Sequence, residues 1–302
     1  MSSFFFHQTS LRDPYTQIAW EESLALSMRK FGMKLGVRLW RNQSCLVLGI
    51  SERENETISH SYLQTFRENY NSVLYNPLVL NPCRKFFPKI DKAWIARRAS
   101  GGGTVFQNET DNLNFSLFVD ISDRQDLYPV QKSYDTLLGI AIQALKNQGL
   151  QLQTAGKSDI SLMGADGILR KVSGNAQFRK KDIIVQHGTL ILDANLFQNI
   201  EKFQLHPPEE PEYRAKRSHR DFLTPLPIQL DPEKLGKKIL KYLQIECKLS
   251  QTESNSSKNT FNLLKESLIL RKKLMLEKLT RFNIVFMLLA AQEVMNTPKR
   301  LL

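Results

Sequence analysis

Cysteine, metal-binding patterns and long apolar runs are scarce in this chain of 302 residues. Three cysteines (Cys45, Cys83 and Cys247) lie far apart and form no C-x-x-C pair, which disfavours a disulfide framework and suits a reducing compartment. The five histidines show no metal-ligand spacing, so we predict no metal site. No secretory signal is visible, and the apolar stretch at 284–291 is too short to cross a bilayer. We therefore expect a soluble, cytoplasmic protein without membrane contact.

Acidic residues are outnumbered by basic ones, and the formal net charge is +12. Such an excess suggests an acidic partner, which can be nucleic acid, a membrane surface or an acidic protein. A non-enzymatic nucleic-acid-binding protein is thus one alternative. Because the sequence carries no recognisable nucleic-acid-binding motif, we expect no nucleic acid partner.

Glycine is also rare, with 14 residues, yet three stand together in RRASGGGTVF, residues 97–106. Glycine lets a ligand approach the main chain, and successive backbone N–H groups in such a turn can bind an anion. Arg98 adds a planar, permanently charged group suited to phosphate. The alternative is a tight turn between strands with surface arginines. The pattern is neither a P-loop nor a G-x-G-x-x-G fingerprint.

Two further segments carry polar groups in predicted strands. Lys171 stands three residues before Gly174 in RKVSGNAQ, where a lysine can act on a carboxylate or phosphate. His187 lies in QHGTLILD, residues 186–193. The alternatives are a solvated surface lysine and a structural histidine.

Strands alternate with a few helices along the chain, which predicts an α+β fold with a mixed sheet. Hydrophobic spacing predicts helices over 13–31, 54–70, 130–148 and 231–244. Strands are predicted within 37–41, 45–50, 93–99, 113–120, 158–163, 168–179 and 183–193. We divide the chain into a catalytic domain (1–249), a linker (250–260) and a basic helical tail (261–302).

Several segments together resemble the lipoate–protein ligase family. They are, in chain order, DPYTQIAWEE, the hairpin-like LWRNQSCLVLG, RRASGGGTVFQNETDNLNFS, GKSDISL, KVSGNAQ and QHGTLILD. The resemblance runs from about residue 13 to about residue 222. It implies a biotin/lipoate ligase-like catalytic domain, with a mixed sheet flanked by helices, here followed by a short helical C-terminal tail.

The resemblance also implies an ATP-dependent enzyme with named site residues. Lys171 would be catalytic, touching both the lipoyl carboxylate and the α-phosphate. Residues implied to bind ATP or the adenylate are Arg98, Gly103, Thr104, Val105, Phe106, Asn112, Asp159 and Lys171. Residues implied to bind lipoate are Lys171, Ser100, Gly101, Gly102, Gly174, His187, Gly188 and Thr189.

The implied reaction has two steps. Lipoate and ATP, with Mg²⁺, give lipoyl-AMP, and the lipoyl group then passes to a lysine of an apo lipoyl carrier domain. Such domains occur in 2-oxoacid dehydrogenase E2 components and in the glycine cleavage H protein. Only about 40 residues follow the linker, too few for a comfortable independent core. Either the family's C-terminal accessory function is reduced, or a separate accessory chain supplies it.

The sequence departs from the family pattern in two places. Gln107–Asn112 stands where the family commonly has His-Asp-x-Gly-Asn, is one residue longer and lacks the glycine. Residues 71–91 look like an insertion, either a surface loop or an element that recognises the carrier.

Three alternative enzymes share this fold. A transferase that works through a cysteine thioester needs a thiolate near the acyl carbonyl, but no cysteine occurs between residues 84 and 246. A lipoyl or octanoyl transferase could use a preformed acyl donor without an efficient ATP step. A biotin ligase is disfavoured because the Gly-Arg-Gly-Arg-x-Gly signature is absent.

Overall fold

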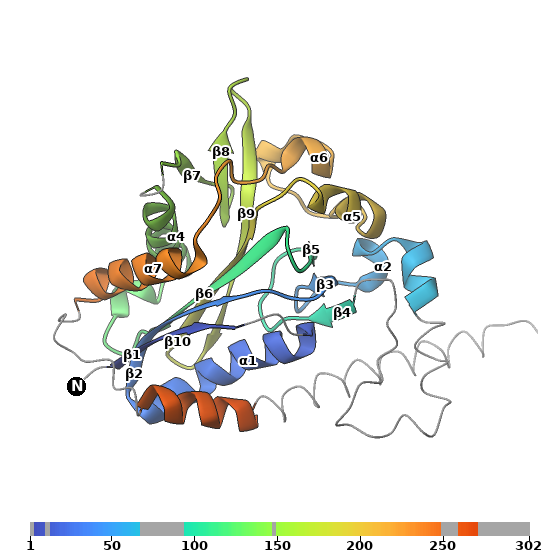
Figure 1. The fold of residues 1–302 in the computed structure, drawn as a ribbon. Helices are drawn as coiled ribbons and strands as arrows, with labels where there is room; N and C mark the ends of the chain where they lie inside the picture. The colour runs from blue at the N-terminus through green and yellow to red at the C-terminus, as the bar shows by residue number, and fades with distance from the viewer. Residues whose placement is uncertain (1–2, 10–12, 67–93, 147–148, 249–258, 271–302) are drawn as a thin grey trace, which may run out of the picture.

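A large sheet of seven strands forms the centre of the molecule (Figure 1). The computed structural model describes residues 3–9, 13–66, 94–146, 149–248 and 259–270. In spatial order the strands are β1 (Ser3–Gln8), β2 (Met33–Trp40), β6 (Asn112–Asp120), β10 (Ile183–Ile191), β9 (Leu169–Lys180), β8 (Asp159–Met163) and β7 (Leu152–Ala155). The strand β1 runs parallel to β2, and the remaining neighbours are antiparallel. The predicted mixed sheet is therefore confirmed.

Two long helices, α4 (Val130–Lys146) and α7 (Pro232–Glu246), pack together on one face of this sheet. Their apolar residues and those of β2 and β6 form one buried cluster. The helix predicted over 231–244 is found as α7, and its start is capped: the Asp231 side chain accepts a hydrogen bond from the Lys234 N–H at 3.1 Å, and Pro232 occupies the first turn.

The opposite face is covered by α1 (Pro14–Ser27) and by a helical segment, residues 259–270. Leu24 of α1, Phe118 of β6 and Leu263 are all fully buried in a shared cluster. The Trp20 indole N–H donates to Ser267 Oγ at 3.0 Å. The described part of the predicted tail thus contacts α1, as Figure 1 also shows.

A second sheet, with the order β4-β3-β5, lies beside the large one (Figure 1). Its strands are β4 (Trp94–Arg97), β3 (Cys45–Leu48) and β5 (Val105–Gln107). The predicted hairpin of residues 39–49 is therefore wrong, because β2 pairs with β1 and β6 in the other sheet. The connecting Ser44 donates through N–H and Oγ to Glu109, which holds the chain where it passes between the sheets.

Several short helices connect these elements. They are η1 (Met28–Phe31), α2 (Glu54–Thr57), η3 (Gln125–Leu127), α5 (Leu196–Phe203), η4 (Glu212–Arg214) and α6 (His219–Phe222). The helix predicted over 54–70 is interrupted, because Ile58 forms an isolated β-bridge with Gln204 before residues 60–66 resume a helix. The predicted insertion at 71–91, most of the linker and residues 271–302 lie outside the described residues. No helix within the described ranges is both long and apolar enough to cross a membrane.

Candidate active site

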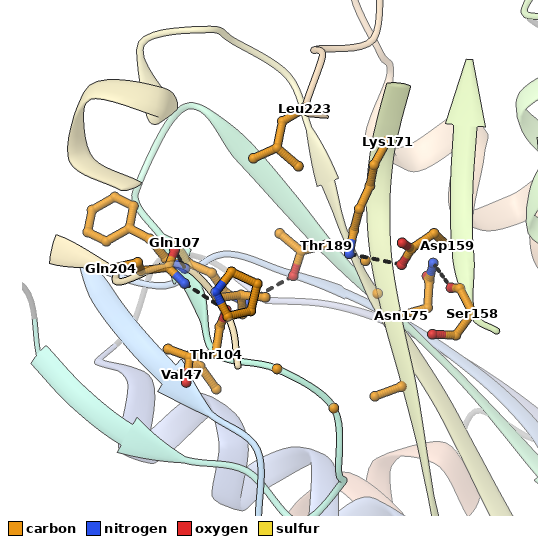
Figure 2. A pocket seen from close by; sticks show the side chains of 18 of the residues that line it. Val47, Thr104, Gln107, Ser158, Asp159, Lys171, Asn175, Thr189, Gln204 and Leu223 are labelled. Carbon is orange, nitrogen blue, oxygen red and sulfur yellow. Dashed lines mark hydrogen bonds and ion pairs between the residues drawn. The ribbon is translucent and has the colours of Figure 1, made fainter. Parts of the chain in front are cut away.

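A cavity of about 520 Å³ is lined by residues of both sheets, of α1 and of the connection that follows α5. Its volume falls in the range of about 300–1,000 Å³ that is usual for small-molecule sites. Most of the predicted site residues line it, namely Arg98, Gly102, Gly103, Thr104, Val105, Phe106, Asp159, Lys171, Gly174, His187, Gly188 and Thr189. In Figure 2, Lys171 points into the cavity beside Asp159, with Thr104, Gln107 and Gln204 on the other side.

Lys171 reaches the cavity because of an irregularity in β9. The register with β8 shifts between Ile160, which faces Ser173, and Ser161, which faces Lys171. The extra residue, Val172, packs into the core on the α4 side, so the bulge turns Lys171 toward the opposite face. The Lys171 backbone is also held by the Thr224 N–H, which donates to its carbonyl at 2.9 Å.

The Lys171 ammonium lies 2.9 Å from Asp159 Oδ1 and directly above Gly174. A Cβ at Gly174 would come within 2.8 Å of Lys171 Nζ, so the glycine makes room for the lysine. Lys171 and Gly174 are three residues apart in the sequence, and the structure brings them together with Asp159.

Tyr213, which no local sequence pattern indicates, holds the other side of Asp159. Its hydroxyl donates to Asp159 Oδ2 at 2.8 Å, and its ring packs against Phe222 with centroids 5.1 Å apart. Burial and the neighbouring Asp159 carboxylate raise the pKa of Tyr213, so the hydroxyl keeps its proton and remains a donor. Asp159 is thus fixed between a cation and a hydroxyl.

Arg98 serves the glycine loop itself, here meaning residues 100–103. Its Nη2 donates to the carbonyls of Gly101 (2.7 Å) and Gly103 (2.9 Å), and its Nε donates to Ser100 Oγ at 2.9 Å. The third guanidinium nitrogen, Nη1, donates to the Val47 carbonyl at 3.0 Å. Burial lowers the pKa of Arg98 to about 10, so the group stays charged at neutral pH.

The Arg98 guanidinium, which the sequence predicts to bind a phosphate, therefore points toward the glycine loop instead. All three guanidinium nitrogens of Arg98 hold the loop, although the side chain still borders the cavity. Gly102 adopts φ +83°, and a Cβ there would lie 3.2 Å from Arg98 Nη2. Left-handed backbone and the nearby arginine together explain this glycine.

His187 links the glycine loop to α1. Its Nδ1 lies 2.8 Å from Glu21 Oε2, and its Nε2 lies 2.7 Å from Ser100 Oγ. Burial alone would raise the pKa of Glu21, but His187, Ser116 and Arg38 together lower it, so the carboxylate is charged. Because both ring nitrogens are engaged, we now expect His187 to support the loop and to offer a ligand mainly its ring surface.

A ring of neutral polar groups lies on the wall formed by β5, β6 and β10. Gln107 Nε2 donates to Thr189 Oγ1 at 2.9 Å, Thr189 donates to Asn114 Oδ1 at 2.7 Å, and Asn114 donates back to Gln107 Oε1 at 3.0 Å. Asn112 is not part of this ring. It is fully buried, and its Oδ1 accepts from the Asn108 N–H at 2.7 Å.

Three predicted residues do not line the cavity: Ser100, Gly101 and Asn112. Ser100 and Gly101 lie behind the loop surface, as partners of Arg98. For Asn112, the residue that lines the cavity is Asn114, two positions further along β6 and on the same face of the strand. Gly188 is needed for close approach, because a Cβ there would lie 1.9 Å from Asn175 Oδ1.

The outer edge of β5 is covered by Gln204. Its Oε1 accepts from the Phe106 N–H at 3.1 Å, and its Nε2 donates to the Thr104 carbonyl at 2.7 Å. Part of the remaining wall is apolar, which suits an aliphatic chain, whereas Glu209, Glu210 and Arg214 make another part charged. The apolar lining includes Ile18, Trp40, Val47, Ile191, Leu196 and Ile200.

Neither a cluster of protein ligands for a metal ion nor a thiol at the cavity is found among the described residues. No group of three or more His, Cys, Asp or Glu residues there could hold a metal ion. Cys45 is fully buried, and burial raises its pKa well above the usual range. Neither Cys45 nor Cys247, the described cysteines, lines the cavity.

The two sheets, the flanking helices and the shared cavity define an α+β domain built around a small-molecule site. Residues 13–244 match the lipoyl protein ligase A/B catalytic domain, and the chain belongs to that family. It is 28% identical over 190 residues to lipoate-protein ligase LplJ of Bacillus subtilis, covering 63% of this chain and 46% of that protein. The chain thus spans about half the length of this curated relative.

Solved structures show the same fold. A crystal structure described as lipoate-protein ligase A bound with ATP aligns with a TM-score of 0.60 at 16% identity, covering 89% of this chain and 94% of that one. A bipartite lipoate protein ligase from Thermoplasma acidophilum, described together with its E2 lipoyl domain, also aligns with a TM-score of 0.60 at 16% identity. This second alignment covers 88% of this chain and 91% of the Thermoplasma chain. The predicted fold and family are both confirmed.

Proposed function

We propose that this protein is a lipoate–protein ligase. It activates lipoate with ATP to lipoyl-AMP and then transfers the lipoyl group to a lysine of an apo lipoyl carrier domain. One observation carries the proposal: the Lys171 ammonium, the glycine loop and an apolar part of the wall share a single cavity. Relatives described as lipoate ligases, and structural neighbours described with ATP, lipoic acid and an E2 lipoyl domain, support it.

In the first step a carboxylate oxygen of lipoate attacks the α-phosphorus of ATP, and the bond to pyrophosphate breaks. This reaction brings two anions together. The Lys171 ammonium, which Asp159 and Tyr213 hold in place, can offset the repulsion and stabilise the charge of the transition state. The apolar wall receives the aliphatic chain and keeps water from the acyl carbon.

In the second step the ε-amine of the carrier lysine attacks the acyl carbonyl. The bond from that carbon to the phosphate oxygen breaks, AMP leaves with the bonding electrons, and the proton of the amine passes to water as the amide forms. Because the acyl phosphate is already activated, no nucleophile of this chain is needed. That agrees with the positions of Cys45 and Cys247 away from the cavity and disfavours the thioester alternative.

Magnesium would arrive with the nucleotide, since proteins often hold it through one or two carboxylates and the substrate phosphates. Asp159, which borders the cavity beside Lys171, is a carboxylate that fits this role. Bound there, the ion would neutralise phosphate charge. Cytoplasmic location and a separate accessory chain remain predictions.

The proposal is tested by incubating the purified protein with lipoate, ATP, Mg²⁺ and an apo lipoyl domain, and then weighing the domain. One lipoyl group per domain is expected, and it should depend on ATP. If the domain gains no mass with ATP and none with preformed lipoyl-AMP, the proposal is contradicted.

A transferase that accepts preformed lipoyl-AMP is the second candidate. Lipoate-dependent exchange of pyrophosphate into ATP separates the two functions, because only the full ligase catalyses that exchange.

A further inference from the structure

An anion already sits on the backbone that borders the glycine loop. Glu52 Oε2 accepts hydrogen bonds from the Thr104 N–H at 3.1 Å and from Thr104 Oγ1 at 2.9 Å. Glu52 lines the cavity together with Gly103 and Thr104. A carboxylate therefore takes up donors of the kind that phosphate oxygens use.

The position of Glu52 is built into the fold. Arg97 Nη1 donates to the carbonyls of Gly49 (2.8 Å) and Glu52 (2.6 Å), and Arg97 Nη2 pairs with Glu54. One arginine of the Arg97–Arg98 pair thus holds residues 49–54, while the other holds the glycine loop.

These two loops also touch directly. The Ile50 N–H donates to the Ser100 carbonyl at 2.8 Å, and a Cβ at Gly49 would lie only 2.0 Å from the Gly102 carbonyl oxygen. Gly49 is thus required for this close approach. These backbone contacts and the ion pair between Arg97 and Glu54 hold the segment that carries Glu52 beside the glycine loop.

Charge decides what this arrangement does to a ligand. Glu52 carries a negative charge close enough to Arg98 to raise the pKa of that guanidinium against the effect of burial. A phosphate near the same donors would have to displace the carboxylate or lie beside it, and repulsion between like charges grows with the number of phosphate groups. Adenosine, which has no phosphate group, would not be repelled by Glu52.

We infer that Glu52 is a specificity-determining residue, which occupies a phosphate position at the glycine loop and weakens nucleotide binding according to phosphate charge. The inference rests on the proposed function only in taking a nucleotide as the occupant of the cavity. Glu52 should therefore weaken the binding of ATP most, and it should weaken the binding of an acyl-adenylate, which has one phosphate, only slightly.

The test is the binding of adenosine, AMP and ATP to the full chain and to its Glu52→Gln variant, by isothermal titration with and without Mg²⁺. Glutamine keeps an oxygen for the Thr104 donors and removes only the charge. We expect ATP to bind about tenfold more tightly to the variant, AMP about threefold, and adenosine equally well. Glu56→Gln is the matched control, since Glu56 belongs to the neighbouring helix α2 and pairs with Arg53 at the surface.

Several results would overturn the inference: an equal gain for all three ligands, no gain for ATP, or no nucleotide binding by either protein. Weaker ATP binding by the variant only in the presence of Mg²⁺ would also overturn it, because Glu52 would then be an ion ligand. Transfer from preformed lipoyl-AMP by the wild-type chain is measured in parallel. If the wild-type chain shows no such transfer, the proposed function is contradicted. The affinities of both proteins for adenosine, AMP and ATP test the role of Glu52 independently.

Discussion

The two faces of β6 show how one strand serves both packing and chemistry. Leu113, Leu117 and Val119 face α4 and α7 in a continuous apolar core. Asn114 and Ser116 face the other way and make polar contacts: Asn114 joins the ring with Gln107 and Thr189, and Ser116 Oγ donates to Glu21 at 2.5 Å. The residues of the first face can be replaced by other apolar residues of similar volume. The second face depends on particular hydrogen-bond donors and acceptors.

The strand β9 repeats the comparison at a single bulge. Val172 turns into the apolar core, and Lys171, its neighbour, turns into the cavity. Changes on the cavity side should therefore reduce activity with little loss of stability. Changes on the core side should do the reverse.

The largest effect is expected for Lys171→Ala. Removing a preorganised charge from a transition-state site typically costs about 3–4 kcal/mol, or roughly 10²–10³ in rate. Lipoate-dependent exchange of pyrophosphate into ATP should fall by this factor, whereas the thermal midpoint should change little. Lys180→Ala is the matched control, because Lys180 lies on the same strand, pairs with Glu22 and is 41% exposed. Normal exchange by Lys171→Ala would contradict the assigned role.

Leu117→Ala tests the opposite face of the sheet. Leu117 is fully buried, and deleting such a side chain destabilises proteins by about 2–5 kcal/mol. Urea unfolding should show this loss, while the transfer rate per folded molecule stays near that of the wild type. A variant that is stable but inactive would mean that the two faces are coupled.

A smaller effect is expected for Tyr213→Phe. Phenylalanine keeps the packing against Phe222 but removes the hydroxyl that donates to Asp159. Loss of one hydrogen bond to a charged group is worth about 1.5 kcal/mol, so the transfer rate should fall roughly tenfold. Because Asp159 positions Lys171, we expect kcat to fall more than KM for lipoate rises.

Tyr128→Phe controls for removing a phenolic hydroxyl at a site away from the cavity. The Tyr128 hydroxyl donates to Asp182 at the surface, at 2.9 Å. Equal activities of the two tyrosine variants would show that the bond from Tyr213 to Asp159 does not orient Lys171.

Local sequence patterns predicted the fold well. The strands predicted within 113–120 and 183–193 are found as β6 and β10, and the helix predicted over 231–244 from hydrophobic spacing is found as α7. The pairing of β3 could not be predicted, because its partners β4 and β5 follow it across a long intervening segment. A strand's own pattern shows which face is buried, but not which sheet it joins.

The site was predictable where glycines and charges stand close together in sequence. Lys171 and Gly174 are three residues apart, and the bulge in β9 places both on the same face of the strand. Glu52 and Tyr213 were missed, because they meet Thr104 and Asp159 only through contacts between residues more than fifty positions apart. Arg98 was found, but its donors were assigned to a ligand when the loop itself uses them.

The smallest effect is expected at the β8–β9 turn, where Asp166 pairs with Arg170 at 2.7 Å on the exposed surface. Hydrogen bonding to Arg170 lowers the pKa of Asp166 from 3.8 to about 2. A lowered folded-state pKa means that the pair stabilises the protein above pH 3.8 and that this contribution is lost as the pH falls through about 2. Asp166→Asn should therefore lower the thermal midpoint at pH 6 by only about 1 °C, since exposed pairs contribute little. The difference from the wild type should shrink between pH 4 and pH 2, and a difference that persisted there would show that the shape of the turn, not the charge, carries the effect.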